Sequence, residues 1–184
     1  GGFQVGTVGE SIGLKTGDKI VAINGKDYAY MEDLIRPETL LGTNAYYTVD
    51  REGKLIDIPI PGDFIQEFNK KETAANFIFY RFPPDISSTV KGSVADKMGL
   101  EEGDRIVRMN GTPITYFDEI STSLNANNKD SLSIQIERAG KLLSFTEYFK
   151  GEETLGVYPK TPKEFFAEAE RRITYNLAES IPLG

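Results

Sequence analysis

The chain has 184 residues, of which 39% are hydrophobic, so its length allows one large globular domain or two small ones. Its formal net charge of −7 argues against a surface that binds nucleic acid or anionic lipid, because either partner would repel it. The absence of cysteine and histidine excludes disulfides, the usual zinc sites and the triads of serine and cysteine hydrolases. Only carboxylate or lysine chemistry is left open.

One motif occurs twice, as GLKTGDKIVAING at residues 13–25 and as GLEEGDRIVRMNG at residues 99–111. The copies are 86 residues apart, and REGKL at 51–55 corresponds to RAGKL at 138–142 once the spacing between the copies grows by one residue. Self-similarity over so long a period indicates two homologous units. Each copy predicts a Gly-Asp turn, a short strand, an Asn-Gly turn, a helix and a hairpin.

In the first unit, the motif's strand is expected at 19–23 and the hairpin at 45–60, with a helix between them that Pro37 interrupts. The polar, lysine-rich segment that follows is interpreted as a linker. At the repeat spacing, the strand that should precede this unit's first helix would lie before Gly1. The groove of the first unit is therefore either incomplete or completed by another segment, for which residues 155–158 are the candidate.

In the second unit, Thr115 is expected to cap a helix whose apolar residues Phe117, Ile120 and Leu124 recur at helical spacing. A hairpin at 131–149 follows, with its turn at Ala139-Gly140. The alternation of its first strand predicts that three apolar residues share one face: Leu132, Ile134 and Ile136.

The last part of the chain predicts an amphipathic helix. Thr161, Pro162 and Glu164 form a capping-box pattern at its start. Its apolar stripe comprises Phe166, Ala169, Ile173 and Leu177. This helix packs on the preceding unit or lies close to a membrane, and the pattern allows both.

Several carboxylates lie near the glycine turns. We interpret them as solvated turn residues and not as an acid site, because no base or nucleophile accompanies them. They are Asp18, Glu101, Glu102, Asp104, Glu152 and Glu153.

GSVADKMGLEEGDRIVRMNG at 92–111 resembles the core signature of bacterial PDZ domains, in which a short helix ends at Gly-Leu and a Gly-Asp turn and a strand follow. Ala95 and Met98 suit helix contacts, Gly99 suits a left-handed C-cap, and Asp104 can accept backbone hydrogen bonds. The fold class implied is mostly β with short helices (α+β), with two PDZ-like domains in tandem and a C-terminal helix. The expected divisions are a first domain at 1–61, incomplete at its amino end, a linker at 62–76, a second domain at 77–154, and a return strand and membrane-proximal helix at 155–184.

Two such units with more chain after them resemble the extracytoplasmic insert of the site-2 family of intramembrane zinc metalloproteases, of the regulator of sigma-E type. Arg81 and Pro83 match the segment that leads into that family's second PDZ unit, and LGVYPK at 155–160 resembles the strand that closes the tandem. The family's His-Glu-x-x-His motif and its later Asp-Gly ligand are absent from this sequence. The resemblance therefore implies a non-catalytic region without metal or cofactor, with zinc only in the parent protease.

The function implied is a filter or recognition module for substrates of regulated intramembrane proteolysis, such as anti-sigma factors, at the periplasmic face of the bacterial inner membrane. Its partners would be a membrane-protein substrate or an extended peptide, and the parent's own membrane domain. The alternative is the PDZ pair of a periplasmic serine protease, or a stand-alone peptide-binding scaffold. No apolar run approaches the roughly 18 residues that span a bilayer.

PDZ grooves bind an extended peptide beside a strand edge, with a helix as the second wall. In the second unit we expect the edge at 78–82 and the wall on the predicted helix, although its apolar residues also fit plain core. Arg81 and Phe82 are the better functional candidates, because a guanidinium can hold a peptide carboxylate. AANFIFYRFP at 74–83 contains no glycine for a carboxylate loop, which favours a filter that works by size. The candidate peptide-binding residues are Ile78, Phe79, Tyr80, Arg81, Phe82, Phe117, Ile120, Ser121 and Leu124.

Overall fold

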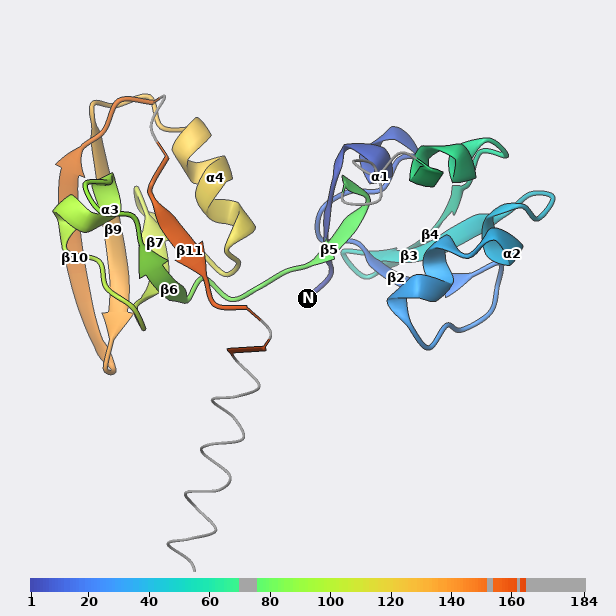
Figure 1. The fold of residues 1–184 in the computed structure, drawn as a ribbon, viewed down its shortest axis with the longest axis horizontal. Helices are drawn as coiled ribbons and strands as arrows, with labels where there is room; N and C mark the ends of the chain where they lie inside the picture. Colours follow the sequence, from blue (N-terminus) through green and yellow to red (C-terminus); the bar gives the residue numbers. More distant parts are fainter. Residues whose placement is uncertain (70–75, 152–153, 162, 165–184) are drawn as a thin grey trace, which may run out of the picture. The chain divides into compact units, whose positions relative to one another are not determined.

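The computed structural model describes residues 1–69, 76–151, 154–161 and 163–164 (Figure 1). The chain divides into two compact units, Gly1–Arg81 and Phe82–Gly184. Eleven strands and a few short helices make up the described part, so the expected mostly β fold with short helices is confirmed. Each unit has its own hydrophobic core.

The first unit consists of a three-stranded antiparallel sheet in the order β2-β3-β4, a separate pair β1-β5, and short helices. Its elements are β1 (Phe3–Val5), α1 (Thr7–Ser11), β2 (Lys19–Ile23), η1 (Met31–Ile35), α2 (Pro37–Leu40), β3 (Tyr46–Arg51), β4 (Lys54–Pro59), η2 (Phe64–Asn69) and β5 (Ile78–Tyr80). The expected interruption at Pro37 is confirmed, because η1 ends at Ile35 and Pro37 begins a new helix in which its missing N–H costs nothing.

The second unit repeats this order around a four-stranded sheet, β10-β9-β7-β8, and a pair β11-β6. Its elements are β6 (Ile86–Thr89), α3 (Val94–Met98), β7 (Arg105–Met109), β8 (Thr112–Pro113), α4 (Asp118–Asn125), β9 (Ser131–Arg138), β10 (Lys141–Tyr148) and β11 (Val157–Pro159). The expected inward face of β9 is confirmed, since Leu132, Ile134 and Ile136 are fully buried. Gly99 is the left-handed C-cap of α3, as its position predicts.

The strands that close the two units differ from the prediction. β5 pairs antiparallel with β1, so Ile78–Tyr80 belongs to the first unit and the expected second-unit edge at 78–82 is wrong. β11 pairs antiparallel with β6, so residues 155–158 do not complete the first unit. In both units the closing strand follows that unit's own hairpin, and this makes each unit a continuous stretch of chain.

Two smaller expectations are also wrong. The segment after β4 is not a plain linker, because Phe64–Asn69 forms η2 and Phe64 is buried in the first core. Thr115 is not the N-cap of α4, which begins at Asp118. Instead, the Glu119 carboxylate accepts hydrogen bonds from the backbone N–H groups of Thr115 and Tyr116.

The predicted capping box at the start of the tail is present. The Glu164 carboxylate accepts hydrogen bonds from the backbone N–H and the hydroxyl of Thr161, and from the hydroxyl of Ser87 in β6. These bonds, that from the Thr161 N–H first, lower the pKa of Glu164 to about 2. The rest of the predicted amphipathic helix, including Phe166 and Leu177, lies outside the described residues.

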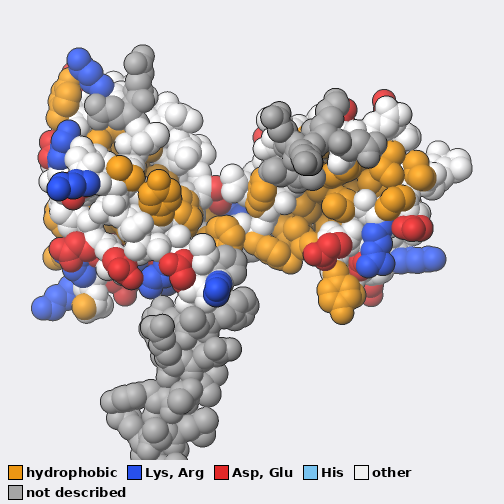
Figure 2. Space-filling view, in the orientation of Figure 1, with side chains coloured by type: hydrophobic (Ala, Val, Ile, Leu, Met, Phe, Trp, Pro, Cys, Tyr) orange, Lys and Arg blue, Asp and Glu red, His pale blue; other side chains and the backbone are white. Residues whose placement is uncertain are grey.

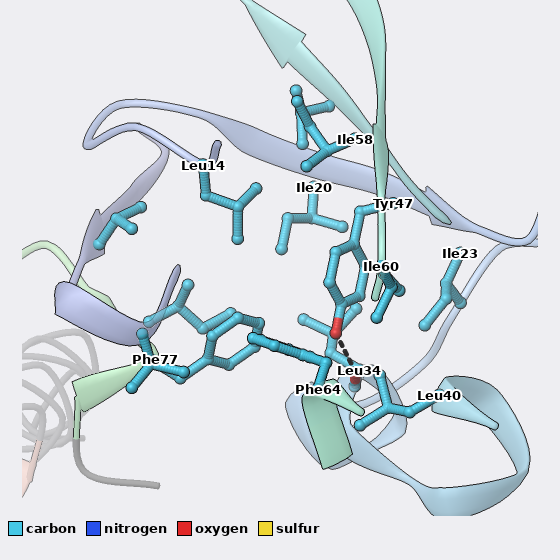
Figure 3. Close-up of a cluster of buried hydrophobic side chains, with 14 of the residues drawn as sticks. Leu14, Ile20, Ile23, Leu34, Leu40, Tyr47, Ile58, Ile60, Phe64 and Phe77 are labelled. Atoms are coloured by element: carbon cyan, nitrogen blue, oxygen red, sulfur yellow. Dashed lines mark hydrogen bonds between the residues drawn. The ribbon is translucent and has the colours of Figure 1, made fainter. Parts of the chain in front are cut away.

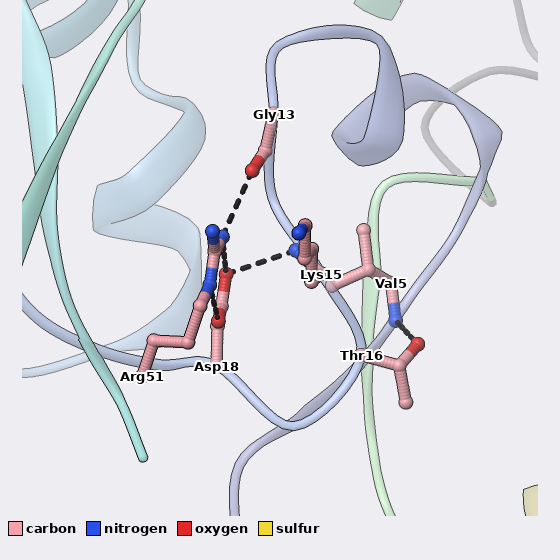
Figure 4. A network of polar contacts seen from close by, with 6 residues as sticks. All are labelled: Val5, Gly13, Lys15, Thr16, Asp18 and Arg51. Atoms are coloured by element: carbon pink, nitrogen blue, oxygen red, sulfur yellow. Dashed lines mark hydrogen bonds and ion pairs between the residues drawn. The ribbon is translucent and has the colours of Figure 1, made fainter. Parts of the chain in front are cut away.

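A buried ion pair occupies the same place in each unit. In the first unit Arg51 donates to both oxygens of Asp18 at 2.7 Å and to the carbonyl of Gly13, and the Lys15 N–H donates to the same carboxylate (Figure 4). Asp18 is only 2% exposed, so its interpretation as a solvated turn residue is wrong.

Asp104 makes the corresponding contacts in the second unit. Arg138 donates to its two oxygens at 2.6 and 2.8 Å and to the carbonyl of Gly99, and the Glu101 N–H donates to the carboxylate as well. Asp104 is 0% exposed, and its interpretation as solvated is also wrong. The repeated motif thus supplies the carboxylate, and the repeated Arg of REGKL and RAGKL supplies the guanidinium.

Replacing Asp104 with Asn should lower the free energy of unfolding of the second unit by about 2 to 4 kcal/mol, because Arg138 would lose the charge that it forks around. Glu101→Gln is the control, since Glu101 contacts the same arginine at 3.3 Å with 65% of its side chain exposed. The control should change stability by less than about 1 kcal/mol. Urea unfolding of the three proteins measures both values, and equal losses would contradict the role of the buried pair.

Acid should remove the contribution of the first pair. Burial alone would raise the pKa of Asp18, but the hydrogen bonds from Arg51 and Lys15 outweigh it and hold the pKa below 3.8. The unfolded chain binds this proton more readily, so the stabilisation is present above about pH 4 and is lost as the pH falls through the folded pKa. The stability difference between the wild-type chain and Asp18→Asn should therefore shrink as urea titrations move from pH 7 to pH 3. A difference that stays constant would contradict this.

Candidate functional site

A pocket of about 250 Å³ lies in the second unit, between α4 and the segment that leads into β11. Figure 1 shows where α4 and β11 lie. The α4 side contributes apolar and small polar side chains, and the other side contributes a loop with two glycines. The lining residues are Phe117, Ile120, Ser121, Leu124 and Asn125 on α4 and just before it, and Gly151, Thr154, Leu155, Gly156 and Val157 opposite.

A backbone hydrogen bond holds the start of the helical wall in place. Phe117 donates its backbone N–H to the carbonyl of Phe82 at 2.8 Å. Ile120 and Leu124 lie four residues apart and therefore on one face of α4, where they are 3% and 8% exposed and also belong to the second core. Ser121, beside them, is exposed. The wall thus offers an apolar floor with a hydroxyl at its rim.

In the opposite wall, two backbone carbonyls point into the body of the unit. The Leu155 carbonyl accepts from Ala95 N–H at 2.9 Å, and the Gly156 carbonyl accepts from Val90 N–H at 2.8 Å. In a trans peptide the carbonyl and the next N–H point in opposite directions. The N–H groups of Gly156 and Val157 therefore point away from α3 and β6, and that of Gly156 has no acceptor among the described residues.

Gly156 makes this arrangement possible. Its φ is +80°, in the left-handed region, and a Cβ placed on it would overlap the side chain of Ser93 at the start of α3. Successive amides that converge beside a left-handed residue form a concavity that suits an anion. The loop is therefore suited to hold a carboxylate at the end of an apolar pocket.

β11 offers the edge that a bound strand needs. In the described part of the unit, β11 is paired on one side only, with β6. A peptide added antiparallel to β11 would end beside residues 155–157, where the outward amides lie. The geometry thus matches an extended segment whose carboxyl terminus reaches this loop.

The sequence analysis found one wall of this pocket and missed the other. Phe117, Ile120, Ser121 and Leu124 line it, and their role in peptide binding stays a prediction. Ile78, Phe79 and Tyr80 lie in β5 of the first unit, and Arg81 follows that strand. Phe82 belongs to the second unit, but it contributes a backbone carbonyl to the start of α4 and not a strand edge.

The missed residues are Leu155, Gly156 and Val157. Their signal was present in LGVYPK, where a glycine directly precedes a short β-type run after the hairpin. The sequence pattern places a carboxylate loop before the first strand of the unit, in AANFIFYRFP, whereas the chain order of this unit places the loop after its last hairpin.

Other chemistry finds no support in the described residues. They contain no group of three or more His, Cys, Asp or Glu side chains that could hold a metal ion. No helix among them is long and apolar enough to cross a membrane. Acidic and basic side chains are intermixed on the face shown in Figure 2.

The chain shows similarity to proteins of known families. Residues 86–138, which run from β6 to the end of β9, match the model of the PDZ domain. The regulator of sigma-E protease RseP of Salmonella typhimurium is 36% identical over 92 residues, covering 45% of this chain and 20% of that protein. A putative zinc metalloprotease of Campylobacter jejuni is 40% identical over 65 residues, covering 35% and 17%.

A probable periplasmic serine endoprotease, DegP-like, of Rhizobium meliloti is 27% identical over 155 residues, covering 71% of this chain and 31% of that protein. The chain spans about a fifth of the length of the RseP relative. The second unit is a PDZ domain, and the chain resembles the PDZ regions of regulator of sigma-E proteases and related zinc metalloproteases.

Proposed function

We propose that this chain is the tandem PDZ region of a bacterial membrane zinc metalloprotease of the site-2 type and that its second unit recognises substrate by binding an extended carboxyl terminus. The observation that carries the proposal is the pocket between α4 and β11, with the outward amides of Gly156 and Val157 at its end. A filter that works by size alone would need no such pocket. The similarity to RseP and to a zinc metalloprotease supports the choice of parent.

The pocket also suggests which residue the peptide would present last. Its floor is formed by the apolar side chains of Ile120, Leu124, Leu155 and Val157. A carboxyl-terminal Leu, Ile or Val would bury its side chain there while its carboxylate meets the loop. A membrane protein that keeps its amino terminus inside gains such a new carboxyl terminus when its outer portion is cut.

In this proposal the region itself carries no catalysis and binds no metal, and zinc is held by the membrane domain of the parent. The region would act on the periplasmic side of the inner membrane, with the membrane-bound substrate and the parent's membrane domain as partners. The sequence that flanks the region in its parent tests this assignment. A His-Glu-x-x-His motif within an apolar helix upstream is expected, and its absence would refute the site-2 parent.

A PDZ pair of a periplasmic serine protease is the second candidate, because the DegP-like relative matches 71% of this chain. Flanking sequence separates the two candidates. A serine protease domain upstream would favour the second, and a membrane-spanning segment close to either side would favour the first.

Replacing Ser121 with Glu should weaken binding of a pentapeptide that ends in Leu by at least about tenfold, because a second carboxylate would stand beside that of the peptide. Thr122→Glu is the matched control, since Thr122 is exposed on the same helix but does not line the pocket. Isothermal titration calorimetry measures both. Equal affinities of the two variants would place the peptide elsewhere.

Replacing Gly156 with Ala should lower the free energy of unfolding of the second unit by about 1 to 3 kcal/mol, because the left-handed backbone and the overlap with Ser93 both oppose a Cβ. Peptide affinity should fall with it. Gly151→Ala is the control, because Gly151 lines the same pocket and a Cβ there meets nothing closer than 4.0 Å. Urea titration followed by second-unit amide signals measures the change, and two equally stable variants would contradict the role of Gly156.

A further inference from the structure

The repeat identifies where a groove of the first unit would lie. Phe3 pairs with Tyr80 and Thr89 pairs with Val157, and Phe3 and Thr89 are one repeat apart, so Tyr80 corresponds to Val157. Leu34 corresponds to Ile120 at the same spacing. A first-unit groove would therefore run between β5 and the helical segment of η1 and α2.

The first unit fills this place with its own chain. The connection between hairpin and closing strand is longer here, residues 60–77 against residues 149–156, and part of it folds into η2. η2 packs against α2. Phe64 of η2 is 3% exposed and belongs to the same core as the helical residues Leu34 and Leu40.

Aromatic contacts fix this segment to the start of β5. The ring of Phe77, directly before β5, lies 5.7 Å from that of Phe64 and 5.3 Å from that of Phe68, both in edge-to-face geometry. Phe64 and Phe68 are 5.2 Å apart in the same geometry, which favours such pairs beyond their buried area. Figure 3 shows Phe64 beside Phe77 on one side and the Leu34 and Leu40 side chains on the other.

The first unit also lacks the loop that marks the second. At the position of Gly156 it has Phe79, whose φ is not positive. Its backbone therefore does not make the left-handed turn that directs the amides outward in the second unit. The two pockets described in the first unit lie elsewhere, one between α1 and η2 and one along residues 41–62.

We propose that Phe64 closes the groove of the first unit from within, so that the chain binds one peptide, in its second unit only. The inference rests on the proposed function in treating the space between closing strand and helix as a peptide site. The first unit would then serve as a spacer whose groove is filled by its own Phe64. The peptide specificity of the two units would reside in residues 117–125 and 154–157.

Titration of the whole chain with a pentapeptide that ends in Leu, followed by amide chemical shifts, locates the sites. One peptide per chain is expected, with saturable shifts at Ile120, Leu124 and Val157 and none at Leu34 or Tyr80. Saturable shifts in both units would overturn the inference and leave the proposed function intact. An absence of shifts in the second unit would refute the proposed function, and the closure of the first unit is then decided by the next experiment alone.

Thiol labelling tests the closure without any peptide, because the chain has no cysteine of its own. Leu34→Cys and Ile120→Cys place a thiol at corresponding positions of the two helical walls. Under conditions that keep the chain folded, Ile120→Cys should react with a maleimide at least about tenfold faster than Leu34→Cys, because Ile120 lines the 250 Å³ pocket, whereas Leu34 is 0% exposed and lines neither described pocket of the first unit. Equal rates would overturn the inference.

Phe64→Ala in the Leu34→Cys chain should raise its labelling rate toward that of Ile120→Cys. Phe64→Leu, which keeps most of the apolar volume if the alanine variant fails to fold, should give an intermediate rate. Gln66→Ala is the control, because Gln66 lies on the same helical turn and is exposed. A rate that stays slow in folded Phe64 variants would show that another residue closes the groove and would overturn the proposal.

Discussion

In each unit an arginine binds both oxygens of a buried aspartate, and this ion pair holds the unit together at the point where three elements meet. In the second unit, Arg138 at the end of β9 binds Asp104 in the turn before β7 and the carbonyl of Gly99 at the end of α3. α3 in turn donates the Ala95 N–H to the carbonyl of Leu155. The position of the loop at residues 155–157 therefore depends, through α3, on this ion pair, and the high cost of an unpaired buried charge opposes other arrangements.

The two units use the same framework for different ends. Both keep the motif, the buried Asp–Arg ion pair and the closing strand, and one difference between them is the length of chain between hairpin and closing strand. In the second unit that connection is short and turns at Gly156, which leaves an apolar hollow. In the first unit it is longer and places Phe64 and Phe68 against Phe77. The longer connection thus accompanies a filled core in the first unit and the shorter one an open pocket in the second, because burying the unit's own aromatic side chains lowers the free energy as burying a ligand's would.

Local signals in the sequence predicted the local structure well. The duplicated motif, the Asn-Gly turns, the break at Pro37 and the inward face of β9 all follow from residues close together in the chain. The pairings that close the units could not be read in this way, since β1 and β5 are separated by most of a unit and short strands of similar composition compete for the same partner. The ion pair was missed for the same reason. Asp18 and Arg51 lie far apart in the sequence, and an aspartate beside a glycine carries the composition of an ordinary solvated turn.

The residues that follow β11 are bonded to β6, the strand with which β11 itself pairs. Lys160 donates its N–H to the carbonyl of Asp85, and Glu164 holds the hydroxyl of Ser87, so the residues after β11 are clipped to β6. β11 pairs with β6 on one side and has an open edge on the other in the described part of the unit. Under the proposed function, a bound peptide and these hydrogen bonds would both stabilise β11, so each would favour the other. The start of the tail is therefore coupled to the strand pair that supplies one wall of the pocket.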